Sequence, residues 1–505
     1  DAQSIDSFRG ANIENILNFK KDYPDYKVYK LEQNYRSTQN IVDAANSVIE
    51  NNKNQIQKDV WTSNEPGAKI NVLRTLTDNE EGKVFSNRIF DKKHSAEAEY
   101  QDFAILYRTN AQSRSFEESL RKLNIPYKIY GGLSFYQRKE IKDLLAYFRL
   151  TANPTDEEAL KRVINYPKRA IGNTTVDALI VAANEMQLPI WDVISTERLD
   201  LVNINGGAKT KLREFTTMIK SFSILMEEKP AYDTAQHIAS SSNLLKELYS
   251  DKTPEGVGRY ENIQELLAGI KEFQESAEEG TVNTLSDFLI DVALLTDADK
   301  DTEEDKNKVV LMTIHASKGL EFPYVHIVGL EENLFPSQLS LNSRDELEEE
   351  RRLFYVALTR AEKECTLSYA NSRYRWGNLI TSEQSRFIDE IDEKFLHHET
   401  PYHKTGAGRS LNSRTRSQST TTSSFSPPKK LKKIDNSPVA PSSSSGNNSD
   451  LSQLKVGYNV QHERFGKGKV VAIEGTKPNT KATVFFPRVG QKQLLLKFAK
   501  LEILD

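Results

Sequence analysis

The hydrophobic pattern of residues 70–150 alternates between two periods. Short apolar runs rich in Val, Ile and Leu predict strands, and longer stretches with an apolar residue every three or four positions predict helices. The expected strands are 70–76, 103–107 and 127–130, and the expected helices are 80–90, 116–123 and 141–150. Strands that alternate with helices indicate a parallel sheet covered by helices on both faces.

The stretch ahead of this block predicts three more elements. Residues 13–19 carry an apolar helical face, and residues 26–31 alternate as a strand does. Ser37 or Thr38 can then cap a helix whose apolar face begins at Ile41. These elements lead directly into the expected sheet.

Residues 153–307 change in character, because helical patterns dominate there and strand patterns nearly vanish. This predicts a helical insertion into the α/β domain. Within it, residues 166–175 (YPKRAIGNTT) look like a turn between two helices with a Gly in the bend. Backbone amides at the start of the second helix can bind a phosphate without reading sequence, and Lys168 and Arg169 add positive charge. A purely structural turn between helices is the open alternative.

The next apolar run, residues 309–312, predicts a buried strand. It stops at a polar loop, residues 313–321, and a second apolar run follows at 324–328. Two strands joined by a polar loop are expected to place that loop at the carboxyl edge of the sheet, where α/β proteins bind ligands. An ordinary surface loop is the alternative from this local pattern alone.

A helix is predicted over residues 347–361, with acidic residues at its start and basic residues at its end. Arg360 lies near the end of this helix, before a predicted strand at 365–369. The planar, permanently charged guanidinium of such an arginine can reach over the sheet edge and suits a phosphate. A surface arginine without a ligand is the alternative.

The composition narrows the class of protein. Hydrophobic residues make up 37% and charged residues 28% of the 505, which fits a soluble protein of several domains. No apolar run approaches the roughly 20 residues of a membrane span, so no membrane partner is expected. A single cysteine, Cys365, excludes internal disulfides and cysteine-rich metal sites and fits a reducing cytoplasm. The net charge of −4 means that any nucleic-acid surface must be local.

The last hundred residues predict a linker and a small domain. Residues 401–450 are rich in Ser, Thr, Pro and Asn, which is typical of a disordered linker. Its basic cluster, 429–433, either adds phosphate affinity or is a solvated charge run. Residues 454–505 predict a small β-barrel, with ten Lys and Arg against four Asp and Glu. Its expected strands are 457–460, 470–473, 483–486 and 493–496, with turns at Gly466-Lys467-Gly468 and at Gly475.

Five segments, in order along the chain, resemble motifs of one helicase family. They are QSIDSFRGA (3–11), LEQNYRST (31–38), GGLSFYQRKEIKDLLAYFRL (131–150), TIHASKGLEF (313–322) and EEERRLFYVALTRAEK (348–363). They are similar to motifs III, IV, IVa, V and VI of the UvrD/PcrA/Rep family of superfamily 1 DNA helicases. Each motif is moderately specific, but five in family order over most of the chain identify the sequence as a member.

This resemblance implies an ATP site. Gln3 would sense the γ-phosphate, Arg36 would contact it, and Arg360 would be the finger that stabilises charge on the transferred phosphoryl group. Tyr35 would stack on the adenine, and Glu321 would meet the ribose. Without the family, Tyr35 and Arg36 would be a turn tyrosine and a surface arginine.

The resemblance also implies DNA contacts. Phe8 stands where the family has a base-stacking Trp, with Arg9 beside it, and His315 would contact the DNA backbone. Gly172 and Thr174 would bind a DNA phosphate at the turn in the helical insertion. A core aromatic at Phe8 and a structural or solvated His315 are the alternatives.

The fold class implied by the resemblance is α/β. It has a RecA-like, P-loop-NTPase-type parallel sheet as second motor domain, a helical inserted subdomain and a small C-terminal β-barrel. The expected domains are the end of the first motor domain (1–34), the second motor domain in two parts (35–150 and 308–397), the inserted subdomain (151–307), the linker (398–453) and a Tudor-like barrel (454–505). Asp6 departs from the family pattern, which usually has a second stacking Tyr there.

The implied function is an ATP-dependent helicase that moves 3′→5′ on single strands and unwinds duplexes in DNA repair or replication. ATP and Mg²⁺ are the expected cofactors. Single-stranded and junction DNA are the expected partners, in the cytoplasm with the nucleoid. The Tudor-like tail implies RNA polymerase as a further partner, and DNA competes for that role because of the tail's charge.

Two parts of such a motor are not found in the sequence. No G-x-x-x-x-G-K-[ST] loop occurs, nor an apolar strand ending in Asp-Glu, so both parts and the Mg²⁺ ligands are expected upstream of Asp1. We therefore expect no ATPase or unwinding activity from this chain alone. A non-enzymatic, truncated DNA- or RNA-polymerase-binding protein is the alternative. A helicase–nuclease of the AddA or RecB kind would carry a nuclease domain where this chain has a Ser-rich linker and a small barrel.

Overall fold

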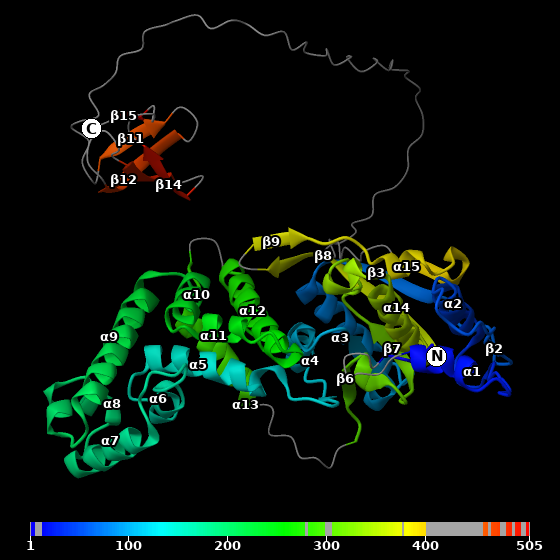
Figure 1. Cartoon of the computed structure of the whole chain (residues 1–505), viewed down its shortest axis with the longest axis horizontal. Helices are drawn as coiled ribbons and strands as arrows, with labels where there is room; N and C mark the ends of the chain where they lie inside the picture. Colours follow the sequence, from blue (N-terminus) through cyan, green and yellow to red (C-terminus); the bar gives the residue numbers. More distant parts are fainter. Residues whose placement is uncertain are drawn as a thin grey trace, which may run out of the picture. The chain divides into compact units, whose positions relative to one another are not determined.

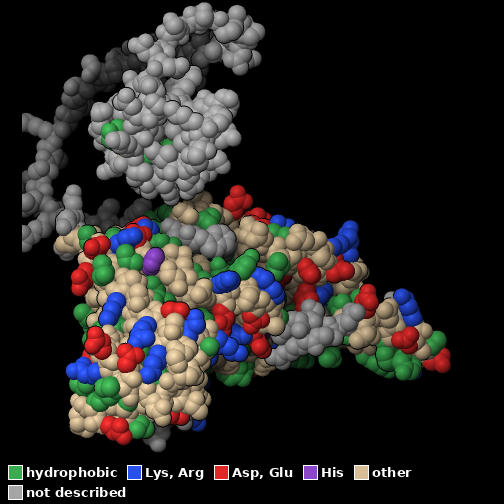
Figure 2. Space-filling view, turned by 60° about the vertical axis from the view of Figure 1, so that its left-hand side comes forward, with side chains coloured by type: hydrophobic (Ala, Val, Ile, Leu, Met, Phe, Trp, Pro, Cys, Tyr) green, Lys and Arg blue, Asp and Glu red, His purple; other side chains and the backbone are tan. Residues whose placement is uncertain are grey.

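The computed structural model contains two compact units, Asp1–Ala407 and Gly408–Asp505, each with its own sheet. The structure describes residues 2–5, 13–277, 281–297, 306–375, 378–399, 458–462, 466–474, 481–486, 490–495 and 501–503. Within this described part, no helix combines the length and the apolar character needed to cross a bilayer. On the face shown in Figure 2, basic and acidic side chains are interspersed, as expected for a chain of nearly balanced charge.

An eight-stranded sheet forms the centre of the first unit (Figure 1). Its strands are β3 (Ile70–Thr77), β4 (Phe103–Tyr107), β5 (Tyr127–Ile129), β6 (Val309–Thr313), β7 (Phe322–Ile327), β8 (Ala361–Arg375), β9 (Asn378–Thr381) and β10 (Leu396–Glu399). Seven of these described strands are parallel in the order β10-β3-β8-β7-β4-β6-β5, and β9 pairs antiparallel with β8. The predicted α/β fold with a parallel sheet is therefore confirmed.

Helices cover both faces of this sheet, as its apolar strands require. The helices are α2 (Gln39–Ile49), α3 (Asp78–His94), α4 (Ser113–Lys122), α14 (Arg344–Leu358) and α15 (Arg386–Asp389). In β4, Ala104 and Leu106 join the core beneath α2, α14 and α15. Phe103, Ile105 and Tyr107 join the opposite core, beneath α3 and α4. Because successive side chains of a strand point to opposite faces, a strand buried on both sides must be apolar throughout.

A helical body is inserted between β5 and β6 (green and cyan in Figure 1). Its helices are α5 (Lys139–Ala152), α6 (Glu157–Val163), α7 (Asn173–Met186), α8 (Ile190–Ile194), α9 (Gly206–Glu228), α10 (Ala231–Ser241), α11 (Leu244–Ser250), α12 (Pro254–Glu275) and α13 (Leu285–Asp297). These helices share a core of their own, and α5 contributes Ile141, Leu144 and Tyr147 to it. The expected helical insertion is present, and α5 packs with it; the domain limits at 150 and 307 stay predictions.

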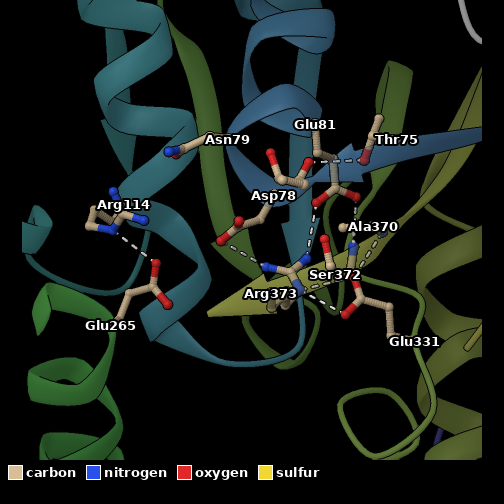
Figure 3. Close-up of polar contacts among 12 residues, drawn as sticks. Thr75, Asp78, Asn79, Glu81, Arg114, Glu265, Glu331, Ala370, Ser372 and Arg373 are labelled. Atoms are coloured by element: carbon tan, nitrogen blue, oxygen red, sulfur yellow. Dashed lines mark hydrogen bonds and ion pairs between the residues drawn. The ribbon is translucent and has the colours of Figure 1, made fainter. Parts of the chain in front are cut away.

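One buried arginine seats α12 of the insertion on the sheet domain (Figure 3). Arg114 of α4 is 2% exposed and forms ion pairs with Glu265 and Glu272 of α12, with N–O distances of 2.9 and 3.4 Å. It also pairs with Glu118 of its own helix at 3.2 Å. Gly269 permits this approach, because a Cβ at that position would lie 2.8 Å from Arg114 Nη1. We call Arg114 and its three carboxylates the α12 seat.

A second buried arginine lies next to the α12 seat (Figure 3). Arg373 of β8 pairs with Glu331 at 2.7 Å and with Asp78 and Glu81 of α3 at 3.2 Å each. Each of the two guanidiniums therefore forms ion pairs with three carboxylates. Buried carboxylates in such excess hold protons more tightly, and burial raises the pKa of Glu81 despite the nearby Arg373.

The predicted strand at 26–31 is wrong. Helix α1 (Glu14–Asp22) precedes this segment, and the next strand, β1 (Gln33–Asn34), pairs only with the short β2 (Trp61–Thr62) among the described strands. Tyr29 and Leu31 are exposed. An alternating pattern becomes a strand only where a neighbouring strand offers partners to its backbone.

Short 3₁₀ helices complete the first unit. They are η2 (Tyr100–Asp102), η3 (Asn110–Gln112), η4 (Phe135–Gln137), η5 (Glu197–Leu201), η6 (His315–Ser317), η7 (Leu339–Asn342) and η8 (Glu393–Phe395). Two of them, η3 and η6, directly follow the carboxyl ends of β4 and β6, so they shape that edge of the sheet.

The second unit contains an antiparallel sheet in the order β14-β13-β12-β11-β15. Its strands are β11 (Asn459–His462), β12 (Gly466–Glu474), β13 (Lys481–Phe486), β14 (Gly490–Leu495) and β15 (Leu501–Ile503). The four predicted strands are present, and β15 was not predicted. The predicted turn at Gly466-Lys467-Gly468 is wrong, because these residues pair with β11; Gly475 lies outside the described residues.

Candidate functional site

A tight turn at residues 34–38 builds the first part of the candidate site. Asn34 Oδ1 accepts hydrogen bonds from the backbone N–H groups of Arg36 (2.8 Å) and Ser37 (3.0 Å), which closes the turn. Ser37 Oγ donates to the Ala361 carbonyl at 2.6 Å, so the turn is fixed to the start of β8. Asn34 is not among the predicted site residues, although an Asn that precedes a turn is a recognisable signal.

Arg36 extends from this turn to a carboxylate from a distant part of the chain. Its Nε lies 2.5 Å from Glu321 Oε2, and its Nη1 donates to the Thr359 carbonyl at 3.1 Å. Arg36 is 28% and Glu321 54% exposed, so the pair lies at the surface, open to a ligand. Burial and the carboxylate of Glu321 raise the pKa of the adjoining Glu362, another residue that the sequence analysis missed.

Arg360 completes the cluster. The prediction that its side chain extends over the sheet edge is wrong. The side chain is 2% exposed and folds back, where Nε donates to the Val356 carbonyl (3.1 Å) and Nη1 to the Leu320 carbonyl (3.0 Å). Burial and the neighbouring guanidinium of Arg36 lower the pKa of Arg360 to about 10, against the effect of Glu321. The structure therefore brings two guanidiniums and one carboxylate together at one place.

This cluster lies at the amino edge of the sheet. The loop 313–321 was predicted to lie at the carboxyl edge, and this is correct only for the first half of the loop. Glu321 precedes β7 and Arg360 precedes β8, whereas His315 follows β6. Because β6 and β7 are both parallel to β4, which lies between them, the loop 314–321 must run from one edge to the other. His315 and Glu321 therefore belong to opposite edges.

The carboxyl edge carries a second group of polar residues around His315. The Ile314 N–H donates to the Tyr107 carbonyl at 2.9 Å, so His315 lies next to Arg108, the residue that follows β4. Arg108 forms a bidentate pair with Glu350 of α14, with its closest N–O distance at 2.6 Å. Arg108 is not among the predicted site residues, although residues that follow parallel strands meet at one edge of the sheet.

Two further residues predicted at the ATP site, Tyr35 and Gln3, are both exposed. Tyr35 is 75% exposed, and its hydroxyl donates to Gln33 Oε1 at 2.7 Å. Gln3 is exposed on segment 2–5, which lies against α14 because Arg352 Nε donates to the Ser4 carbonyl at 2.9 Å.

The expected base-stacking residues cannot be placed. Phe8 and Arg9, together with Asp6, lie outside the described residues.

The turn in the insertion is present at the start of α7. Gly172 is the N-cap residue, and Gly172 and Thr174 are both exposed, as a phosphate contact would require. Arg169 does not add charge to this surface. Its guanidinium donates inward to Tyr147 Oη (2.6 Å) and to the Ser242 carbonyl (3.0 Å). Lys168 is exposed.

The described residues contain no group of three or more His, Cys, Asp or Glu side chains placed to hold a metal ion. The chemistry available at the amino edge is that of two permanent cations and an acceptor carboxylate. Such a set suits an anion with hydroxyl groups nearby.

Comparisons with known proteins give a family for most of the chain. The family described as UvrD-like helicase C-terminal domain matches residues 29–372, and the family described as PcrA/UvrD tudor domain matches residues 456–502. The second match confirms the prediction of a Tudor-like C-terminal domain.

Similarity to individual proteins extends over nearly all of this chain. ATP-dependent DNA helicase PcrA of Leuconostoc citreum is 38% identical over 512 residues, which cover 100% of this chain and 66% of that protein. ATP-dependent DNA helicase PcrA of Bacillus subtilis is 38% identical over 99% of this chain and 66% of that protein. DNA helicase II of Escherichia coli is 36% identical, with 99% and 65% covered. The chain thus spans slightly under two thirds of the length of these relatives.

Proposed function

Because the chain belongs to the UvrD-like helicase family and carries its C-terminal region, we propose that it is the part of an ATP-driven DNA helicase that completes the nucleotide cleft. The whole protein would move 3′→5′ along single strands and unwind duplexes in DNA repair or replication, in the cytoplasm with the nucleoid. The eight-stranded sheet would be its RecA-like second motor domain. The observation that carries the proposal is the convergence of Arg36, Glu321 and Arg360 at the amino edge.

The residues at this edge fit ATP. Arg36 and Arg360 would neutralise phosphate charge, and Glu321 would accept a hydrogen bond from the ribose. Tyr35 would stack on the adenine, and Gln3 would sense the γ-phosphate. When bound, ATP supplies the phosphoryl transfer that drives the motor. The described residues hold no group of three or more metal ligands, and we assign Mg²⁺ no ligand among them.

Arg360 would act as the finger that stabilises charge during this transfer. In the structure its guanidinium donates to the carbonyls of Val356 and Leu320, which are weaker partners than a phosphate. Arg360 would exchange these carbonyls for phosphate oxygens when the cleft closes. Arginine fingers accelerate phosphoryl transfer by about 10³–10⁵ in other enzymes.

DNA would be bound at the opposite edge and by the insertion. His315 would contact the backbone of the translocated strand at the carboxyl edge, while Phe8 and Arg9 would stack on and pair with it from the first motor domain. Gly172 and Thr174 at the start of α7 would bind a duplex phosphate, which suits junction DNA. None of these contacts reads sequence, as a motor that passes over any sequence requires.

The tail would bind RNA polymerase, with DNA as the competing partner. Residues 454–505 hold ten Lys and Arg against four Asp and Glu, which favours an anionic surface of either kind. Binding of the whole chain to core RNA polymerase and to a DNA duplex, each at low and moderate salt, separates the two. A complex with polymerase that survives salt supports the polymerase; retention only on DNA supports DNA.

The central test uses the full-length protein with Arg360→Ala. This variant should bind single-stranded DNA as tightly as the parent and lose at least about 10³-fold in DNA-stimulated ATP turnover. Lys363→Ala is the matched control, because Lys363 is an exposed cation three residues further along the chain. Unchanged turnover in Arg360→Ala would remove the finger role.

A non-enzymatic DNA- or polymerase-binding protein is the second candidate. A helicase needs a phosphate-binding loop of the G-x-x-x-x-G-K-[ST] type, which the sequence given does not contain. The coding sequence upstream of Asp1 distinguishes the two candidates. A reading frame that continues into such a loop supports the helicase, and a start codon directly before Asp1 supports the binding protein.

A further inference from the structure

A small pocket opens between α3 and the sheet, on the face opposite to α14. It has a volume of about 250 Å³. Its floor comes from strands β3, β4, β7 and β8, and its wall comes from the last turns of α3. The lining residues are Asn71, Arg88, Asp91, Lys92, Phe103, Tyr324, His326, Glu364 and Thr366. None of these residues belongs to the cluster of Arg36, Glu321 and Arg360.

His326 places a buried imidazole in the lining of this pocket. The side chain is 6% exposed, and neither Nδ1 nor Nε2 has a hydrogen-bond partner among the described residues. Burial lowers the pKa of His326 to about 3, and the charges of Arg88 and Lys92 act in the same direction. The ring is therefore neutral at physiological pH and offers one N–H donor and one acceptor nitrogen. A buried donor or acceptor without a partner is unfavourable, so a ligand that pairs with it gains free energy.

The two cations of the pocket, Arg88 and Lys92, are already compensated. Lys92 Nζ lies 2.9 Å from Glu364 and also sits 4.4 Å from the centre of the Tyr324 ring. Arg88 Nη1 donates to Glu399 at 3.1 Å. Because each cation faces its own carboxylate, the pocket offers little to a phosphate or a carboxylate ligand.

The rings of Phe103, Tyr324 and His326 form part of the lining of the pocket. Phe103 stacks on Tyr324 with ring centres 5.0 Å apart and on His326 with ring centres 6.2 Å apart. Phe85 does not line the pocket, but the centre of its ring lies 4.5 Å from that of the imidazole. Because these rings stack on one another and Lys92 covers the Tyr324 ring, they give the pocket a rigid lining that is largely apolar.

The volume sets the size of that ligand. A cavity of about 150 Å³ holds benzene, and drug-sized ligands occupy pockets of roughly 300–1,000 Å³. A pocket of about 250 Å³ therefore fits one planar ring system with a few polar substituents. The amide of Asn71 and the hydroxyl of Thr366 line the same space and add donors and acceptors.

We propose that this pocket binds an uncharged nitrogen heterocycle of nucleobase size, with a hydrogen bond to the imidazole of His326. The base comes either from a free nucleobase or nucleoside or from an unstacked base of a single strand. Both sources present the same planar ring with adjacent donors and acceptors. The site does not depend on ATP turnover, so its test is separate from the test of the proposed function.

The test follows the histidine side chains by nitrogen-15 NMR in the full chain. The chain has 8 His, and the signal missing in His326→Phe identifies His326. Free nucleosides at about 10 mM should shift this signal, since a ligand of about ten heavy atoms binds in roughly the millimolar range. His237→Asn, at an exposed histidine of α10 in the helical insertion, should leave the shift unchanged.

A short single-stranded oligonucleotide and an abasic strand of the same length form the second arm. A shift with nucleosides supports the small molecule as the source, and a shift only with the base-bearing strand supports a strand base. No shift with any of them, or an equal shift with the abasic strand, overturns the proposal. Thr366→Val keeps the His326 signal visible and should weaken nucleoside binding about tenfold. If this variant bound nucleosides as tightly as the parent and showed the same shift of the His326 signal, the proposal would also be overturned.

Discussion

The guanidinium of Arg36 and the carboxylate of Glu321, 285 positions apart in the sequence, meet with 2.5 Å between Nε and Oε2. The turn that carries Arg36 is held on the start of β8, and Glu321 immediately precedes β7. Because these strands are neighbours in a parallel sheet, the pair is fixed by the sheet and not by local sequence. The amino edge thus holds part of the proposed nucleotide site in place before any ligand arrives.

The Arg36–Glu321 pair should contribute little to stability. Glu321→Gln removes the charge and should lower the free energy of unfolding by less than about 1 kcal/mol, because both side chains are partly exposed. Glu390→Gln is the comparison, since its partner Arg351 is only 8% exposed, and it should lose about 3 kcal/mol. Urea unfolding of the purified chain measures both. Equal losses would mean that the Arg36–Glu321 pair is structural.

Gly269→Ala should weaken the α12 seat. The added Cβ would lie 2.8 Å from the guanidinium of Arg114, which is surrounded by three carboxylates and has little room to move. We expect a loss of about 1–3 kcal/mol in thermal unfolding. Gly258→Ala in the same helix meets nothing within 4 Å and should raise stability by roughly 0.5–1 kcal/mol, because Ala favours helix. If both variants changed stability alike, the close approach at Gly269 would be irrelevant.

The α12 seat should loosen as the pH rises. Burial raises the pKa of Glu272 to about 8; Asp78, Glu265 and Glu118 act in the same direction, and Arg114 opposes them. A pKa raised in the folded state means that the folded protein binds the proton more tightly. The stabilisation is therefore complete below about pH 4.5 and is lost as the pH rises towards 8, by up to about 1.4 kcal/mol per pH unit.

Hydrogen exchange of α12 between pH 5 and 9, corrected for intrinsic exchange rates, measures this loss. In Glu272→Gln the pH dependence should flatten, because the side chain no longer titrates. Asn79, whose amide donates to Glu272, keeps an acceptor in this variant. Glu255→Gln, at an exposed position in the first turn of the same helix, should keep the parent's profile. A parent profile that is flat from the start would contradict the prediction.

His326→Phe should stabilise the chain in the absence of a ligand. The substitution removes two buried ring nitrogens that have no partner among the described residues and keeps a ring against Phe85 and Phe103. We expect a gain of about 1 kcal/mol in urea unfolding. A loss of stability would show that the imidazole has a structural partner in solution.

The sequence predicted those elements whose pattern is decided locally. The apolar runs at β4 and β6 are short and are bounded by polar residues, so their ends can be recognised in the sequence. The strand predicted at 103–107 has the same bounds as β4 in the structure. The segment 26–31 shows the limit of this method. Its alternation is as regular as that of a strand, but Tyr29 and Leu31 are exposed and no described strand pairs with it.

The candidate site shows the same division. The motifs identified Arg36, Glu321 and Arg360, and the structure brings all three together. The sequence could not predict that Arg360 folds back, because its partner, the Leu320 carbonyl, is 40 positions away. Nor could it predict which edge each residue reaches, since that depends on β4 lying between β6 and β7.

The crossing of loop 314–321 from one edge of the sheet to the other has a mechanical consequence. His315 and Glu321 are the two ends of one short tether, six positions apart. A movement at the carboxyl edge, where we propose that DNA binds, is therefore transmitted directly to the amino edge, where we propose that the nucleotide binds. One extra residue between them would leave each grip chemically intact and yet introduce slack. In the proposed motor, this change would leave the binding of nucleotide and the binding of DNA intact, but the two events would no longer be coupled in time.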